Sequence, residues 1–234
     1  MSDASDEQSR ESLHTWSLAM AGASLVAMAA WIAAPRALAP TAMTLAYGGW
    51  TLVAFGYLFA RIRGHRRAAD LVTGARVLLC VVLFASHSLE PSPAWWKVAV
   101  AIAIIALDAV DGWVARRAGP SEVGAVFDME SDAFYLVTMC GIAYLYLGVH
   151  PVVFVMGALR PLYVVGWAVL RLFVEPRSPN RKGTRLGRVV HFATVVALIA
   201  DLSPALPVGA KTAIAGAGSA LILYSYAIHI WRWA

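Results

Sequence analysis

Charged residues are scarce in this chain. Asp, Glu, Lys and Arg make up 14% of its 234 residues, whereas a soluble domain carries about 25%. Hydrophobic residues make up 60% and the mean hydropathy is +0.66, so a soluble fold of this size could not bury so much apolar surface. The scarcity of charge therefore excludes an ordinary soluble domain and indicates a protein whose solvent is lipid.

Cysteine and histidine patterns are also missing. The two cysteines, Cys80 and Cys140, lie in apolar runs without a CxxC spacing, which excludes a disulfide framework. The six histidines show no HxxxH or HExxH pattern, so none of them is predicted to bind metal.

Long apolar runs fill the rest of the chain and separate at proline, glycine and charged breaks, where helices tend to end. Each run is close to the roughly 20 residues that cross a bilayer. We therefore predict an all-α, polytopic membrane bundle preceded by an acidic, exposed tail at 1–12. About eight transmembrane helices are expected, at 14–34, 41–62, 70–88, 94–118, 122–148, 151–174, 189–206 and 208–232.

The basic residues are distributed unevenly between the two sides of this topology. If the helices alternate, fourteen Lys and Arg fall on one side and three on the other, while Arg76 and Arg160 lie within helices. Cytoplasmic loops carry such an excess, so both termini and the basic connections are predicted to be cytoplasmic. The isoelectric point near 9.5 then reflects topology and binding to anionic lipids, and no nucleic-acid partner is expected.

Carboxylates are concentrated where an apolar chain should not hold them. Asp108 and Asp111 are three residues apart and Asp128 and Asp132 are four apart, so each pair lies on one face of its helix. Counted from Pro120 in the intervening turn, Asp108 lies twelve residues before and Asp132 twelve after, while Asp111 lies nine before and Asp128 eight after. In an antiparallel hairpin the four side chains lie at matching depths, and they converge if the two faces point at each other.

Such a cluster is costly in a membrane. One Asp at a helix centre costs about 2.5–3.5 kcal/mol, so four cost on the order of 10 kcal/mol, comparable to the stability of a whole domain. Clustered carboxylates also repel one another. Packing does not explain the arrangement, whereas divalent cations do, because they require clustered hard oxygen ligands. The neighbouring Gly112 and Arg116 suit a phosphate group beside the metal.

The region reads Asp108-x2-Asp111-Gly112-x2-Ala115-Arg116-x7-Gly124-x3-Asp128-x3-Asp132. This pattern resembles the signature of the CDP-alcohol phosphotransferases, membrane enzymes of phospholipid synthesis, apart from a turn that is one residue shorter than in the family. A second segment, Asp70-x2-Thr73-x2-Arg76, is similar to the segment that precedes the family's first core helix. The resemblance implies a six-helix core at 70–234, preceded by two additional transmembrane helices and a basic cytoplasmic link at 13–69.

The resemblance also implies a reaction. A CDP-alcohol such as CDP-diacylglycerol would give its phosphatidyl group to the hydroxyl of a small polar acceptor, with release of CMP. Two Mg²⁺ or Mn²⁺ ions would be bound, and Asp132 would be the catalytic base. The metal ligands would be Asp108, Asp111, Asp128 and Asp132. The contacts to the CDP-alcohol would be Asp70, Thr73, Gly112, Arg116 and Ser121.

The acceptor is less clearly marked. Arg160 lies inside the sixth predicted helix with no obvious acidic partner, and a lone intramembrane Arg is a functional candidate. Arg185 and Arg188 belong to a basic cluster that topology alone explains equally well. If these residues converge, the anion pocket favours glycerol 3-phosphate or inositol phosphate as acceptor, although amino acids and amino alcohols stay open.

Two other functions fit intramembrane aspartates. A divalent-cation transporter would need neither Arg116 nor the nucleotide segment. A non-catalytic membrane protein of the same fold would lack signature residues, and none is missing. We therefore expect an integral membrane enzyme of a bacterial inner membrane, with its site facing the cytoplasm and a homodimer as one possible assembly.

Overall fold

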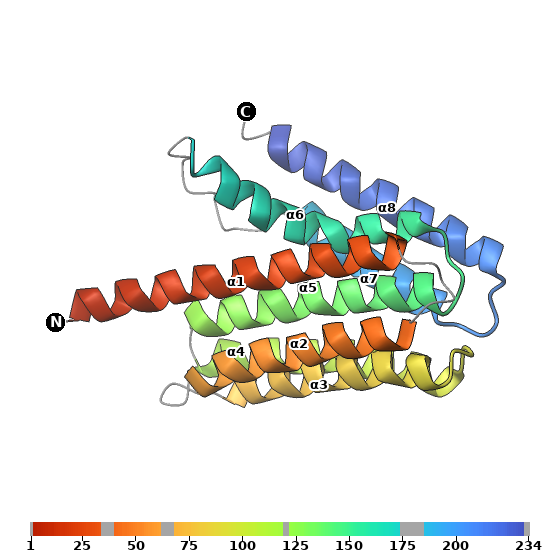
Figure 1. The fold of residues 1–234 in the computed structure, drawn as a ribbon, viewed down its shortest axis with the longest axis horizontal. Helices are drawn as coiled ribbons and strands as arrows, with labels where there is room; N and C mark the ends of the chain where they lie inside the picture. Colours follow the sequence, from red (N-terminus) through yellow and green to blue (C-terminus); the bar gives the residue numbers. More distant parts are fainter. Residues whose placement is uncertain (1, 34–39, 62–67, 119–121, 174–184, 232–234) are drawn as a thin grey trace.

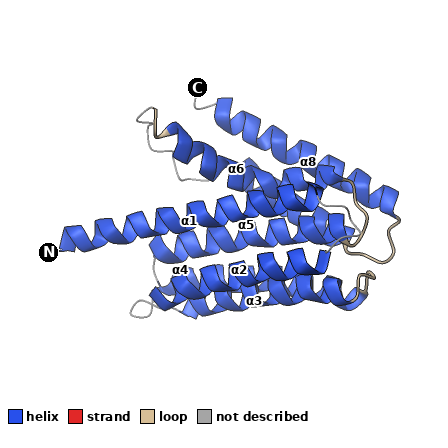
Figure 2. Ribbon diagram, in the orientation of Figure 1, coloured by secondary structure: helices blue, strands red, loops and turns tan. Residues whose placement is uncertain are grey.

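The protein is a bundle of α-helices. The computed structural model describes residues 2–33, 40–61, 68–118, 122–173 and 185–231, and these residues contain no strand (Figure 2). The predicted all-α class is confirmed for this part of the chain. The helices are α1 (Ser2–Ala33), α2 (Pro40–Arg61), α3 (Ala68–Leu89), α4 (Trp95–Ala118), α5 (Glu122–Leu145), α6 (Phe154–Leu170) with the short 3₁₀ helix η2 (Pro151–Val153) before it, α7 (Arg185–Asp201) and α8 (Val208–Trp231).

The helix ends differ from the predicted ones where local geometry intervenes. α5 ends at Leu145 rather than 148 because Gly148 adopts φ 71°, a left-handed conformation that commonly closes a helix. The N–H of Leu147 donates to the carbonyl of Ile142 there. α1 begins at Ser2, inside the segment expected to be a tail, and its start projects beyond the other helices (Figure 1).

Five helices are long and apolar enough to cross a membrane, so the chain is an integral membrane protein. α5 is not among them, and it carries the carboxylates Asp128, Glu130 and Asp132. α7 has only 17 residues. Of the eight expected crossings, five are supported by the length and composition of the described helices. The candidate spans are Leu13–Ala33, Thr41–Ala60, Ala69–Leu89, Trp95–Arg117 and Pro151–Leu170.

α5 forms the centre of the bundle. Its residues 133–144 are all buried, as expected for a helix that is apolar on every side. It packs against α1, α3, α6 and α7. The aspartates near its beginning are therefore carried by the most enclosed helix of the bundle.

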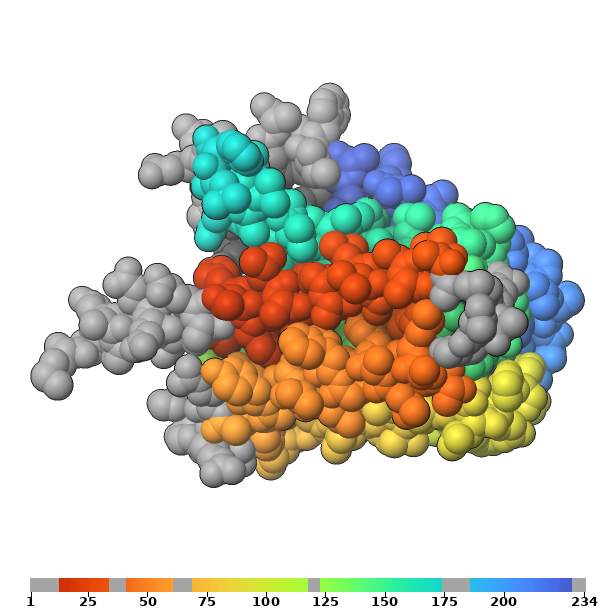
Figure 3. Space-filling model, in the orientation of Figure 1, coloured from red at the N-terminus to blue at the C-terminus, as the bar shows by residue number. Residues whose placement is uncertain are grey.

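α1 and α2 are part of the bundle core rather than an appendage. Trp31 of α1 lies 5.3 Å from the ring of Tyr47, 5.6 Å from Phe84 and 6.1 Å from Phe154, which belong to α2, α3 and α6. A Cβ at Gly141 of α5 would come within 2.9 Å of the Trp31 ring, so only glycine allows this close packing. Figure 3 shows that α1 and α2 form much of one face of the molecule.

Candidate active site

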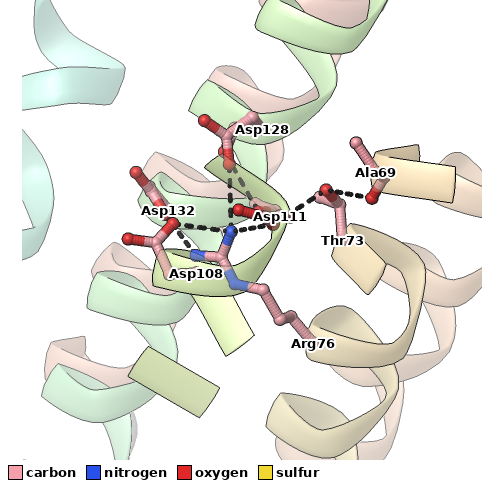
Figure 4. Close-up of polar contacts among 8 residues, drawn as sticks. Ala69, Thr73, Arg76, Asp108, Asp111, Asp128 and Asp132 are labelled. Atoms are coloured by element: carbon pink, nitrogen blue, oxygen red, sulfur yellow. Dashed lines mark hydrogen bonds and ion pairs between the residues drawn. The ribbon is translucent and has the colours of Figure 1, made fainter. Parts of the chain in front are cut away.

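The four predicted aspartates come from α4 and α5, which both pack against α3. Asp108 and Asp111 lie on α4, and Asp128 and Asp132 lie on α5 (Figure 4). One oxygen from each of Asp108, Asp111 and Asp128 lies within 4.8 Å of the others, a spacing that could hold a metal ion. Asp132 joins this group through a side chain of α3.

That side chain is Arg76, whose guanidinium ends among all four carboxylates (Figure 4). Nη1 lies 2.8 Å from Asp108 Oδ1, 2.9 Å from Asp111 Oδ2 and 2.9 Å from Asp128 Oδ1. Nη2 lies 2.5 Å from Asp132 Oδ1. The Arg76 side chain is only 2% exposed. One positive charge thus faces four carboxylates, which leaves the cluster short of cations.

The upstream segment on α3 supplies these contacts. Thr73 and Arg76 are three residues apart, so both point from α3 toward the same neighbours. The hydroxyl of Thr73 lies 3.0 Å from Asp111 Oδ2 and 3.1 Å from the carbonyl of Ala69. No role was predicted for Arg76 itself, although its place in an apolar helix is a signal for one.

This geometry can be compared with known proteins. Residues 66–231 match the sequence profile of a family described as CDP-alcohol phosphatidyltransferase. The match covers well over half of the chain. The chain belongs to the CDP-alcohol phosphatidyltransferase family. Comparisons with curated proteins and with solved structures gave no match. The family's reaction is phosphatidyl transfer in phospholipid synthesis, so the match supports a transferase over a cation transporter.

The residues of this site fit a divalent metal. The three clustered ligands are all carboxylates, the hard oxygen donors that Mg²⁺ and Mn²⁺ prefer. The Arg76 guanidinium among them is a cation bound by the same three carboxylate side chains. The family generally uses divalent metals, in agreement with this donor set.

The structure describes four of the five residues that are expected to contact the CDP-alcohol. Asp70 and Thr73 are buried on one face of α3. Arg116 is exposed in the last turn of α4, and its side chain lies over Gly112, where an added Cβ would come 3.3 Å from Arg116 Nη1. Ser121 lies outside the described residues.

The prediction that Arg160 has no acidic partner is wrong. Arg160 Nη2 lies 2.8 Å from Glu130 Oε1, and the hydroxyl of Ser17 donates to the same oxygen at 2.6 Å. Glu130 is only 3% exposed. The sequence could not show this pair because the two residues lie 30 positions apart on different helices. Arg160 on α6 thus neutralises a buried carboxylate, and α1 joins the contact through Ser17.

α7 brings one histidine near the aspartates. It packs against α4 and α5, and His191 interacts electrostatically with Asp108 and Asp128. Arg188 lies three residues before His191 and is exposed. Arg185 begins α7, but its side chain lies outside the described part of the chain. No sequence pattern marks His191, because its place near the aspartates depends on how α7 packs against α4 and α5.

Proposed function

We propose that this protein transfers a phosphatidyl group from CDP-diacylglycerol, or a related CDP-alcohol, to the hydroxyl of a small polar acceptor. The acceptor oxygen forms a bond to the phosphorus that carries the lipid, and the bond from this phosphorus to CMP breaks. The observation that carries the proposal is the group of three carboxylates within 4.8 Å of one another, with Asp132 joined to it through Arg76.

Asp108, Asp111, Asp128 and Asp132 would hold one or two Mg²⁺ or Mn²⁺ ions. Bound metal would neutralise the diphosphate and the charge that develops on the attacking and leaving oxygens. Asp132 takes the acceptor's proton at its carboxylate. Its position supports this role, because Asp132 lies outside the close group of three ligands and its side chain is 31% exposed, so a hydroxyl can reach it.

The donor would be held at the ends of α3 and α4. The proposed contacts to the CDP part of the donor are Asp70, Thr73, Gly112, Arg116 and Ser121. Arg116 is the best placed to bind a phosphate or the nucleotide, since it is exposed at the end of the helix that carries two of the aspartates. A guanidinium suits phosphate because it donates two hydrogen bonds at once.

The proposed core comprises residues 70–234, with α1 and α2 as an addition to it. The site would face the cytoplasm of a bacterial inner membrane, and the excess of Lys and Arg in the predicted cytoplasmic connections supports this orientation. Membrane lipids surround the bundle, and a homodimer is the proposed assembly. The close packing of α1 on α5 and α6 supports a direct structural role for the addition.

The transfer reaction has a direct test. Purified protein in lipid vesicles should release CMP from CDP-diacylglycerol only when a suitable acceptor is added. EDTA should stop the release, and Mg²⁺ or Mn²⁺ should restore it, because the carboxylates alone cannot neutralise the diphosphate. A panel of glycerol 3-phosphate, inositol phosphate, an amino acid and an amino alcohol identifies the acceptor. Full CMP release in EDTA would contradict the metal site.

The proposed contacts to an anionic acceptor are Arg160, Arg185 and Arg188, and Arg160 would bind the acceptor while its Nη2 stays paired with Glu130. The Arg160→Ala variant should raise the acceptor KM by roughly 10- to 150-fold, the value of one charged hydrogen bond, while the donor KM stays close to wild type. A double variant with Glu130→Gln is the control, because it removes the carboxylate that Arg160→Ala leaves buried without its cation. The KM effect should persist in the double variant. A rise in the donor KM alone would place the acceptor elsewhere.

A further inference from the structure

Arg76 occupies the point at which the candidate metal ligands converge. Its Nη1 contacts an oxygen of Asp108, Asp111 and Asp128 at 2.8–2.9 Å, and these three residues are the group whose oxygens could hold a metal. This single nitrogen donates to Asp111 and Asp128 and forms an ion pair with Asp108. No other Lys or Arg among the described residues contacts any of the three within ion-pair distance.

A metal and Nη1 compete for the same lone pairs. A small divalent cation binds carboxylate oxygens at about 2.0–2.6 Å, so three converging oxygens that wrap such an ion leave no room between them for a nitrogen. The positive charge of the ion would also repel a guanidinium in direct contact with the same oxygens. Metal uptake by Asp108, Asp111 and Asp128 thus requires Nη1 to move.

We propose that Arg76 is an internal counter-ion of the metal-free enzyme, and that it gives up Asp108, Asp111 and Asp128 when these residues take up a divalent cation. This inference rests on the proposed function, because it takes the three residues as metal ligands. In the metal-free protein Arg76 reduces repulsion among four carboxylates. Its Nη2 contacts Asp132 separately, so the side chain can remain beside the site after Nη1 leaves.

After metal uptake, the guanidinium of Arg76 can bind the phosphate of the donor. Arg76 is almost fully buried but faces four carboxylates, and an arginine side chain stays charged in proteins. Nη1, once released, can donate to a phosphate oxygen of the donor, a strong charge-assisted contact. Arg76 therefore couples metal uptake to donor binding.

The test is the affinity of the full chain for Mn²⁺, measured by calorimetry in detergent without donor, at mildly alkaline pH where the carboxylates are ionised. Arg76→Gln removes the competing cation and should bind Mn²⁺ at least roughly tenfold more tightly than wild type, the value of one or more charged hydrogen bonds. Arg117→Gln is the matched control. Arg117 lies on the helix of Asp108, but its guanidinium packs 3.7 Å from the Trp113 ring centre, so its loss should leave the affinity close to wild type.

Thermal unfolding gives a second readout. Without metal, Arg76→Gln should unfold at a lower temperature than wild type, because four carboxylates lose their shared cation, and Mn²⁺ should raise its unfolding temperature more than that of wild type. Arg76→Met covers the case in which Arg76→Gln does not fold. Methionine fills much of the space of the arginine stem but carries no charge and no donor, so Arg76→Met should also bind Mn²⁺ more tightly than wild type.

The outcomes separate this inference from the proposed function. Equal or weaker Mn²⁺ binding by a folded Arg76→Gln or Arg76→Met protein, with wild type still binding, overturns the inference and leaves the metal site intact. Absence of Mn²⁺ binding in wild type and in both variants overturns the metal site, and the inference with it. Tighter binding that a further Asp128→Asn substitution abolishes supports both.

Discussion

Replacing Asp132 by Asn is expected to reduce turnover by roughly 10²–10⁴-fold, the usual contribution of a general base. Asn keeps the size of the side chain and one oxygen that can accept from Arg76 Nη2, which lies 2.5 Å from Asp132 Oδ1. It cannot take a proton from the acceptor hydroxyl. Donor affinity should therefore remain close to wild type. Metal affinity should fall less than in Asp111→Asn, because Asp132 lies outside the close group of three carboxylates, while kcat falls strongly, as expected for an interaction made in the transition state.

Asp201→Asn is the matched control for this substitution. Asp201 ends α7, at the opposite end of that helix from Arg188, and has no hydrogen-bond partner among the described residues. The same chemical change there should leave kcat unaltered. Wild-type turnover in Asp132→Asn would remove Asp132 as the base, and an equal loss in Asp201→Asn would indicate general damage to the bundle.

Replacing Asp111 by Asn should abolish both transfer and tight metal binding. Asp111 is 3% exposed, and its Oδ2 accepts from both Thr73 and Arg76. Loss of a group that only supports a metal ligand costs roughly 10–100-fold in affinity or activity, so loss of a direct ligand should cost more. Arg76 keeps Asp108, Asp128 and Asp132 as partners, and the fold should therefore survive.

Thr73→Val gives the graded comparison. Valine has nearly the shape of threonine but donates no hydrogen bond to Asp111, so activity and metal affinity should fall by roughly 10–100-fold. Calorimetry with Mn²⁺ and the CMP assay would check both variants. Wild-type metal affinity in Asp111→Asn would exclude Asp111 as a ligand, and a larger loss in Thr73→Val than in Asp111→Asn would point to a separate role for Thr73 in donor binding.

The sequence predicts the order and type of the helices because each apolar run ends at a residue with a physical reason to break a helix. The exact residue at which a helix ends also depends on the local backbone conformation. α5 ends early at Gly148, whose left-handed backbone is one of several conformations that glycine allows. The start of α1 at Ser2 lies in a polar segment that hydrophobic periodicity cannot assign.

The sequence likewise predicts one part of the site and misses another. Spacing within one helix puts Asp108 with Asp111 and Asp128 with Asp132, since a helix fixes which residues share a face. Contacts between helices depend on how each helix is rotated, which the sequence does not reveal. For this reason the sequence missed the contact of Arg76 with all four aspartates.

The N-terminal helices show the same limit. The sequence predicted α1 and α2 only as two helices added before the family core. The family match begins after them, at residue 66. The structure nevertheless joins α1 to the helix of the catalytic candidates, because Ser17 donates to Glu130, which lies between Asp128 and Asp132 on α5. A truncated core would therefore lose a contact to a buried carboxylate and the aromatic packing around Trp31.

The most direct measurement follows the phosphorus atom of the donor. CDP-diacylglycerol labelled only at the phosphorus attached to the lipid should give a labelled phospholipid product and unlabelled CMP, in a metal-dependent reaction and in equal amounts, since the acceptor attacks that phosphorus and CMP leaves. Label released in a nucleotide would mean that a different bond breaks. Label that stays in unreacted donor with every acceptor, while Mg²⁺ or Mn²⁺ is present, would contradict phosphatidyl transfer by this protein.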